Sequence, residues 1–149
     1  MSLLEKVQKD LVASLKARNS VKSDVLRLLV AALKNAGISK PSGEEMSESD
    51  EVKVIFAESK KLKDSVEQYS KAGRDDLSKR EKEQLGYVME YLPEQMSEKE
   101  IEKLVDKAIS KIGAESMRDI GKVMGIVMGE VSGKADGVVV SKIVKKKLS

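Results

Sequence analysis

The side chains most able to do chemistry in this chain are basic residues near its C-terminus. Residues 117–149 hold seven basic and three acidic side chains, a local net charge of +4. Lys142, Lys145 and Lys146 are spaced i, i+3 and i+4, so a helix places them in one stripe. A cationic stripe can bind a phosphate chain through counterion release. Lysines at a helix C-terminus also suit the helix dipole, so a purely solubilising role stays open.

Acid–base and metal chemistry have few candidates. The 149 residues include no His and no Cys, which removes the commonest general base, the thiolate nucleophile and the usual transition-metal ligands. Asp75 and Asp76 adjoin, but neighbouring residues on a helix do not face one another. No P-loop or GxGxxG motif is present. We therefore predict no catalytic residue, no metal site and no cofactor, and we expect no enzyme activity from this chain alone while leaving that question open.

Three glycines precede the lysine stripe at intervals of four residues. Gly121, Gly125 and Gly129 fall on one helix face, and each costs up to about 1 kcal/mol of helix propensity relative to alanine. Close packing against a neighbouring helix is the favoured explanation. The alternative is a strip without side chains on which an RNA sugar–phosphate chain can settle.

The elements that must position these residues are helices. Charged residues make up 36% of the chain and aromatic residues 3%, and the apolar residues recur at helical spacing. Serine N-caps with an acid three residues later, at Ser2 and Ser97, predict two helix starts. The pattern predicts an all-α fold with seven helices, which cover about residues 2–16, 20–37, 47–73, 75–92, 97–113, 116–133 and 136–148.

A domain boundary is predicted at Pro93, because the residue before a proline is disfavoured in a helix. We expect a four-helix N-terminal domain over residues 1–92, a linker at 93–96 and a three-helix domain over 97–149. Within them, Leu15 and Leu28 are expected on buried stripes. Gly37 is expected to end the second helix, and Met117 to join the apolar face of the sixth.

The N-terminal segment predicts neither a secretory signal nor a membrane anchor. Its sequence, MSLLEKVQKDLVASLK, is amphipathic and carries acids within the first ten residues. No run approaches the roughly 20 apolar residues of a membrane span. The lack of Cys agrees with a reducing compartment. We expect a cytoplasmic protein that does not contact membranes.

Four stretches carry a family resemblance. They are LRLLVAALKNA, KDSVEQYSKAGRDDL, EYLPEQMSEKEIEKLV and GAESMRDIGKVMGIVMGEVSGKADGVVVSKIVKKKL. The most specific parts are YLP at 91–93, SMRDIGKVMG at 116–125 and GKAD at 133–136. Across essentially its whole length the chain resembles the YqeY-like family, with its GatB/YqeY domain.

The resemblance implies an all-α N-terminal domain followed by a three-helix GatB/YqeY-type module. That module is similar to the tail of the B subunit of aspartyl/glutamyl-tRNA amidotransferase, which is associated with grasping tRNA. Similar modules appended to aminoacyl-tRNA synthetases are also linked to tRNA. Free-standing members are often labelled carbon–nitrogen ligases with glutamine as amide donor, a label we interpret as inherited from the shared tail.

Charge and resemblance together predict a tRNA-binding accessory protein of translation without its own active site. No aromatic residue follows Tyr91, so contact with the RNA backbone is favoured over base stacking. The candidate nucleic-acid-binding residues are Arg118, Lys122, Gly125, Lys134, Lys142, Lys145 and Lys146.

Two alternatives remain at this point. One is a helical adaptor that binds an aminoacyl-tRNA synthetase or another translation factor, and the other is a component of a glutamine-dependent carbon–nitrogen ligase. Asp136 is expected to cap the last helix, although the amides there could instead bind an anion beside Lys134. Structural roles are favoured for Gly73, as a turn, and for Arg27, paired with an acid on a neighbouring helix. The sequence does not indicate an oligomeric state.

Overall fold

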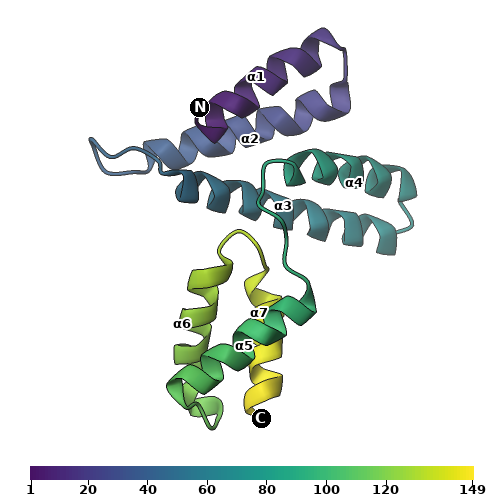
Figure 1. The fold of residues 1–149 in the computed structure, drawn as a ribbon. Helices are drawn as coiled ribbons and strands as arrows, with labels where there is room; N and C mark the ends of the chain where they lie inside the picture. The colour runs from purple at the N-terminus through teal and green to yellow at the C-terminus, as the bar shows by residue number, and fades with distance from the viewer. The chain divides into compact units, whose positions relative to one another are not determined.

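The computed structural model describes residues 1–149 and confirms the all-α class (Figure 1). It holds seven α-helices and one short 3₁₀ helix, with no strand. The chain forms two compact units, Met1–Leu92 and Pro93–Ser149, which are described separately. No helix combines the length and the apolar character needed to cross a membrane.

The first unit consists of two helical hairpins. Helices α1 (Leu3–Lys16) and α2 (Ser20–Ile38) form one, and α3 (Glu48–Lys71) and α4 (Asp75–Met89) form the other. Helix α2 packs on both α3 and α4, so it joins the hairpins. The core between them is mostly aliphatic and contains Val7, Val25, Leu26, Leu29, Leu33, Ile55, Leu62, Val88 and Tyr91.

The helix starts follow from their capping residues. The Ser2 hydroxyl accepts from the Glu5 amide at 3.1 Å, and the Ser97 hydroxyl accepts from the Glu100 amide at 3.2 Å. At α3 the capping box is complete, because the Asp50 carboxylate also accepts from the Ser47 amide at 3.0 Å. These short polar side chains satisfy amides that the first helical turn leaves unpaired. The predicted helix starts at Ser2 and Ser97 are therefore confirmed.

Several predicted details of the first unit are wrong. Gly37 does not end α2, since the helix continues to Ile38 and the Gly37 backbone faces the Met46 side chain. Leu28 is 57% exposed and Leu15 is 45% exposed, because the buried sides of their helices carry Val25, Leu26 and Leu29 in α2 and Val7 in α1. Helix α4 ends at Met89, and residues 90–92 form a tighter turn before Pro93.

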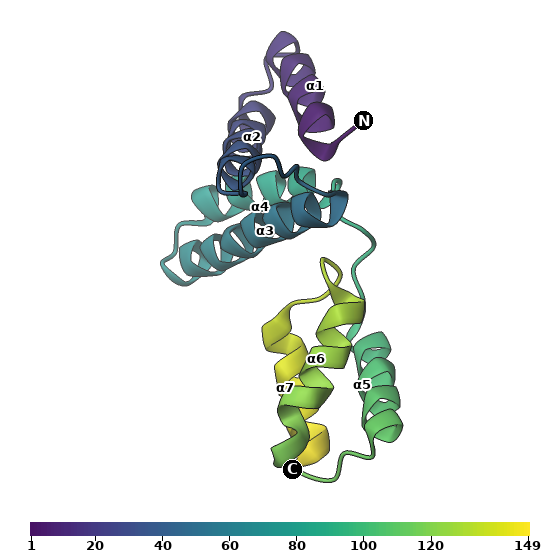
Figure 2. The same cartoon turned by 90° about the vertical axis from the view of Figure 1, so that its left-hand side faces the viewer.

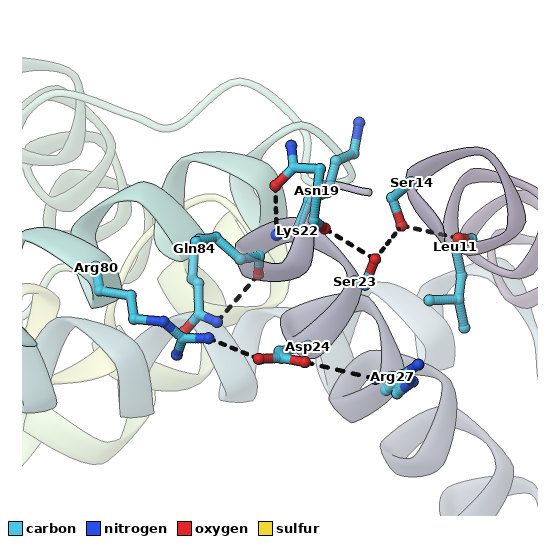
Figure 3. A network of polar contacts seen from close by, with 10 residues as sticks. Leu11, Ser14, Asn19, Lys22, Ser23, Asp24, Arg27, Arg80 and Gln84 are labelled. Atoms are coloured by element: carbon cyan, nitrogen blue, oxygen red, sulfur yellow. Dashed lines mark hydrogen bonds and ion pairs between the residues drawn. The ribbon is translucent and has the colours of Figure 1, made fainter. Parts of the chain in front are cut away.

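A polar network ties α1, α2 and α4 together (Figure 3). The hydroxyls of Ser14 and Ser23 lie 2.9 Å apart, and Ser23 also donates to the Asn19 carbonyl. The Gln84 side-chain amide donates to the Val21 carbonyl at 3.1 Å, which links α4 to the start of α2. Such directional bonds fix the register of neighbouring helices, which apolar contacts alone leave looser.

Arg27 does not pair with a neighbouring helix. Its guanidinium contacts Asp24 of its own helix at 3.5 Å, whereas Arg80 of α4 makes the interhelical bond to Asp24 at 2.6 Å. Gly73 has φ +74° and supplies the turn between α3 and α4, as predicted. The predicted partnership of Arg27 was therefore wrong, and the bond expected for it belongs to Arg80.

The second unit is a bundle of α5 (Glu98–Ile112), α6 (Ile120–Val131) and α7 (Gly137–Leu148), with the 3₁₀ helix η1 (Met117–Asp119) before α6 (Figure 2). Each helix packs on the other two. Their buried core consists of Ile101, Val105, Ala108, Val123, Val127, Val131, Ala135, Val140, Val144 and Leu148. Met117, expected in this core, is 42% exposed because it lies in η1 and not in α6.

Residues 93–96, the predicted linker, are bonded to the second unit. The Met96 amide donates to the Lys134 carbonyl at 2.9 Å, and the Gln95 side chain donates to the Gly133 carbonyl at 2.8 Å. Met96 also packs against the aliphatic core. The turn between α6 and α7 is therefore held from outside by the segment that leads into α5.

Candidate nucleic-acid interface

The lysine stripe of α7 lies on the side of the helix that faces away from the core. Val140, Val144 and Leu148 point inward and are buried. At 3.6 residues per turn, Lys142, Lys145 and Lys146 fall within an arc of roughly 100° on the opposite side. All three are exposed, and their side chains form no ion pair or hydrogen bond. Their charge is therefore available to a partner.

Two further predicted cations lie at the start of α6. Arg118 is in η1, whose first turn is fixed by the Ser116 hydroxyl accepting from the Arg118 amide at 3.3 Å. Lys122 is in the first turn of α6, and both side chains are exposed without a partner. Helices α6 and α7 pack against each other and are joined by the short turn at 132–136, so they run antiparallel. The start of α6 therefore lies at the same end of the bundle as Lys145 and Lys146.

Lys134 is the predicted residue that lies apart from this end. It sits in the α6–α7 turn, where its backbone amide donates to the Val131 carbonyl and its carbonyl accepts from Met96. Its side chain is exposed. The part of α7 between Gly137 and Lys145 spans roughly 12 Å at 1.5 Å per residue. Lys134 therefore lies at the other end of α7 from Lys145 and Lys146, while Lys142 lies near the middle of the helix. We call Arg118, Lys122, Lys142, Lys145 and Lys146, which occupy the start of α6 and the outer side of α7, the basic end.

The glycine strip of α6 does not pack against any part of the chain. Gly121, Gly125 and Gly129 are exposed, and a Cβ atom built on each has no neighbouring atom within 4 Å. The favoured explanation, close packing against α5 or α7, is therefore wrong. The strip lies on the outer side of α6, opposite the buried Val123 and Val127, and Lys122 stands beside it.

Two acidic residues of the second unit, Asp106 and Asp136, occupy groups that could otherwise bind an anion. Lys147 reaches across to α5 and pairs with Asp106 at 3.3 Å, so it contributes little to the basic end. Asp136 caps α7 as expected, because its carboxylate accepts from the Val138 amide at 2.9 Å. The anion site that those amides could have formed is thus filled by a side chain of the protein itself.

The acidic residues form no arrangement suited to proton transfer or metal binding. No group of three acidic side chains is close enough to hold a metal ion. The Asp76 carboxylate is 3.5 Å from the Arg74 guanidinium, which lowers the pKa of Asp76. Burial and a hydrogen bond to Asp10 raise the pKa of Tyr91, so its hydroxyl remains a proton donor within the core.

A cavity in the first unit had no counterpart among the predicted sites. It measures about 580 Å³ and lies among the start of α1, the end of α2 and the loop at 39–47. Its apolar wall includes Leu4, Leu33 and Met46, and Ile38 at its edge is 81% exposed. The sequence could not predict this cavity, because its shape depends on how the loop at 39–47 folds back over the ends of α1 and α2.

The sequence of this chain matches a known protein family. The family model described as Yqey-like protein matches residues 4–148, so the chain belongs to that family. No curated protein matches the chain.

Proposed function

We propose that this chain is a tRNA-binding accessory protein of translation, without its own active site, that contacts the RNA backbone through its second unit. We propose further that this unit is a GatB/YqeY-type module, like the tail of the amidotransferase B subunit. On this proposal the protein acts in the cytoplasm. The observation that supports it best is the basic end, where five exposed cations lie at the start of α6 and along the outer side of α7 and none has an internal partner.

The side chains of the second unit favour contact with the RNA backbone over contact with the RNA bases. No aromatic ring lies in the second unit, so base stacking has no platform there. Lysine acts as a point charge on phosphate oxygens and reads no sequence. The exposed glycine strip next to Lys122 lets a sugar–phosphate chain approach the α6 backbone without displacing a side chain.

A titration of the full chain with total tRNA at several salt concentrations tests this proposal. Five phosphate contacts predict that log K falls against log salt with a slope of about −3.5 to −4.5. The triple variant K142E/K145E/K146E removes three contacts and adds three repulsive charges, so tRNA affinity falls by about 100-fold at low salt. Circular dichroism checks that the helices are kept.

The matched control reverses three exposed lysines of the first unit, K53E/K63E/K79E, which changes the net charge equally. If affinity follows only net charge, both variants lose the same amount and the basic end has no special role. If neither the wild type nor the control binds tRNA at low ionic strength, the proposal is wrong.

The adaptor hypothesis has one observation in its favour, the 580 Å³ cavity of the first unit with its exposed Ile38. Such a concave apolar surface can hold the side chain of a partner protein. Capture of a synthetase or another translation factor that resists ribonuclease and is lost on Ile38→Glu supports this function. Capture that disappears with ribonuclease supports the tRNA proposal instead.

A further inference from the structure

A second concave surface in the first unit is lined by arginines and serines. It lies at the turn between α1 and α2, has a volume of about 280 Å³, and is lined by Leu15, Arg18, Ser20, Ser23, Asp24 and Arg27. We call it the turn cavity. Ser23 is buried and its hydroxyl is bonded to Ser14 and Asn19, so it forms part of the floor. The Ser20 hydroxyl and the Arg18 guanidinium have no partner in the chain.

The charges around the turn cavity do not balance. The single carboxylate, Asp24, has one oxygen bonded to Arg80 at 2.6 Å and the other 3.5 Å from Arg27 (Figure 3). Three guanidiniums, counting Arg18, therefore share one negative charge. Because Arg80 holds Asp24 at close range, Arg27 keeps only a long contact that an incoming anion can replace. Beside this concave surface, Arg18 is therefore left without a carboxylate partner and Arg27 with only the long contact to Asp24.

The backbone at Arg18 holds a non-glycine residue in the left-handed region, where a Cβ atom is strained. Arg18 has φ +56° and is the only residue other than glycine with a positive φ. It closes α1 in a Schellman turn, with the Arg18 amide donating to Leu15 and the Asn19 amide donating to Ser14. Glycine fills comparable positions with positive φ at Gly73 and Gly113, where no Cβ is strained. Strained non-glycine residues tend to cluster at functional sites.

We propose that the turn cavity binds a phosphate group. Guanidinium groups bind phosphate oxygens in a bidentate manner, and here Arg18 and Arg27 line the same cavity. The Ser20 hydroxyl adds a donor at the same edge. The phosphate belongs either to an RNA backbone or to a small phosphate ester, since both present the same oxygens. The site lies in the first unit, so it does not depend on RNA contact by the basic end.

Titration of the ¹⁵N-labelled full chain with inorganic phosphate, at constant ionic strength against sodium chloride, tests the site by NMR. We expect saturable shifts confined to amides between Leu15 and Arg27. Arg18→Gly weakens phosphate binding by about fivefold, equivalent to roughly 1 kcal/mol. The same variant raises the melting temperature by about 2 °C, since glycine suits the left-handed turn. The loss of binding is therefore not a loss of folding.

Two further variants complete the test. Arg27→Gln removes a guanidinium from a regular helical position and weakens phosphate binding without raising the melting temperature. Arg74→Gln, at the exposed α3–α4 turn, removes the same charge away from the cavity and leaves binding unchanged. Shifts that do not saturate, or Arg18→Gly binding phosphate as the wild type does, overturn the proposal. In the latter case Arg18 only closes the turn.

Competing ligands separate the two sources of phosphate. If total tRNA displaces phosphate from the Leu15–Arg27 amides, the site is a second RNA contact. If adenosine 5′-monophosphate saturates these amides and tRNA does not, the ligand is a small phosphate ester. The variant K142E/K145E/K146E leaves the phosphate titration unchanged in either case. Failure of the basic end to bind tRNA is thereby distinguished from failure of the turn cavity to bind phosphate.

Discussion

The two units use their polar side chains in different ways. Every buried polar or charged side chain belongs to the first unit, namely Ser14, Ser23, Glu51, Ser59, Ser78 and Gln84. Each of these is hydrogen-bonded within the chain, and no buried side-chain polar atom lacks a partner. The buried side chains of the second unit are aliphatic. Its cations stay at the surface, where Lys147 pairs with Asp106.

The buried polar groups of the first unit thus contribute to the specificity of folding, whereas the exposed cations of the second unit remain available for binding. Directional bonds in the first unit select one arrangement of its two hairpins, because misplaced helices would leave buried donors unpaired. The second unit is held by packing of Val, Ile, Leu and Ala, which needs no charged group. Substitutions of the buried polar side chains in the first unit should therefore change stability, while substitutions of the exposed cations in the second unit should change tRNA binding.

The largest effect is expected at Glu51, whose carboxylate caps α1 from another helix. It accepts from the Leu3 amide at 3.3 Å and from the Leu4 amide at 2.9 Å. Glu51→Ala leaves these amides without the carboxylate, so unfolding in urea should show a loss of about 2 kcal/mol. The control Glu130→Ala, in the exposed part of α6, should stay within about 0.5 kcal/mol. Equal losses would contradict the proposed contrast between the units.

A smaller effect is expected from the serine pair of the first hairpin. Ser23→Ala removes the bonds to Ser14 and Asn19 and should cost about 1 to 1.5 kcal/mol in the same denaturation assay. Ser141→Ala in α7, where the hydroxyl has no partner, should be nearly neutral. A clear loss at Ser141 would show that the second unit also depends on polar bonds.

A substitution in the glycine strip should stabilise the fold. Gly125→Ala gains helix propensity without a clash, so stability rises by up to about 1 kcal/mol. On the proposed function the new methyl group also weakens tRNA binding, by about two- to threefold in the titration. Gly86→Ala in α4 is the matched control, because it is equally open and lies in the first unit. Unchanged tRNA affinity in Gly125→Ala would remove the strip from the interface.

The smallest effect on stability is expected for Asp50, a surface residue of the first unit, and only at acidic pH. The hydrogen bond from Lys40, at 2.8 Å, and the bonds to Ser47 lower the pKa of Asp50 from 3.8 to about 2. Because the folded pKa is the lower one, this stabilisation is complete above pH 3.8 and disappears as pH falls towards 2. Asp50→Asn should flatten the dependence of stability on pH in that window. An unchanged profile between pH 4 and 2 would show that Asp50 has no such role.

Local signals in the sequence were sufficient to predict where several helices begin and end. Ser2, Ser47 and Ser97 start helices because their hydroxyls accept from amides three residues on, which needs no tertiary contact. Gly113 ends α5 in a left-handed conformation for an equally local reason. The left-handed turn at Arg18 was not predicted, because a Schellman turn that lacks glycine has no residue type that marks it in the sequence.

Contacts between helices decided what local patterns could not. Leu28 fits an apolar stripe of α2, yet it is exposed because α3 and α4 cover only the side with Val25 and Leu29. The glycines of α6 predict a close neighbour, and the bundle places none there. A pattern fixes which residues share a face, but only packing fixes which face is covered.

Residue types and their local spacing were sufficient for the seven helices, the serine caps at Ser2, Ser47 and Ser97, the charge excess near the C-terminus and the absence of imidazole and thiol groups. These depend on residues within one or two turns of each other and on composition. The tertiary structure decided that Lys134 lies apart from the basic end, that Lys147 is paired, and that arginines from a turn and a helix line one cavity. Those facts depend on where the packed helices place side chains in space, which the spacing of residues along the chain does not define.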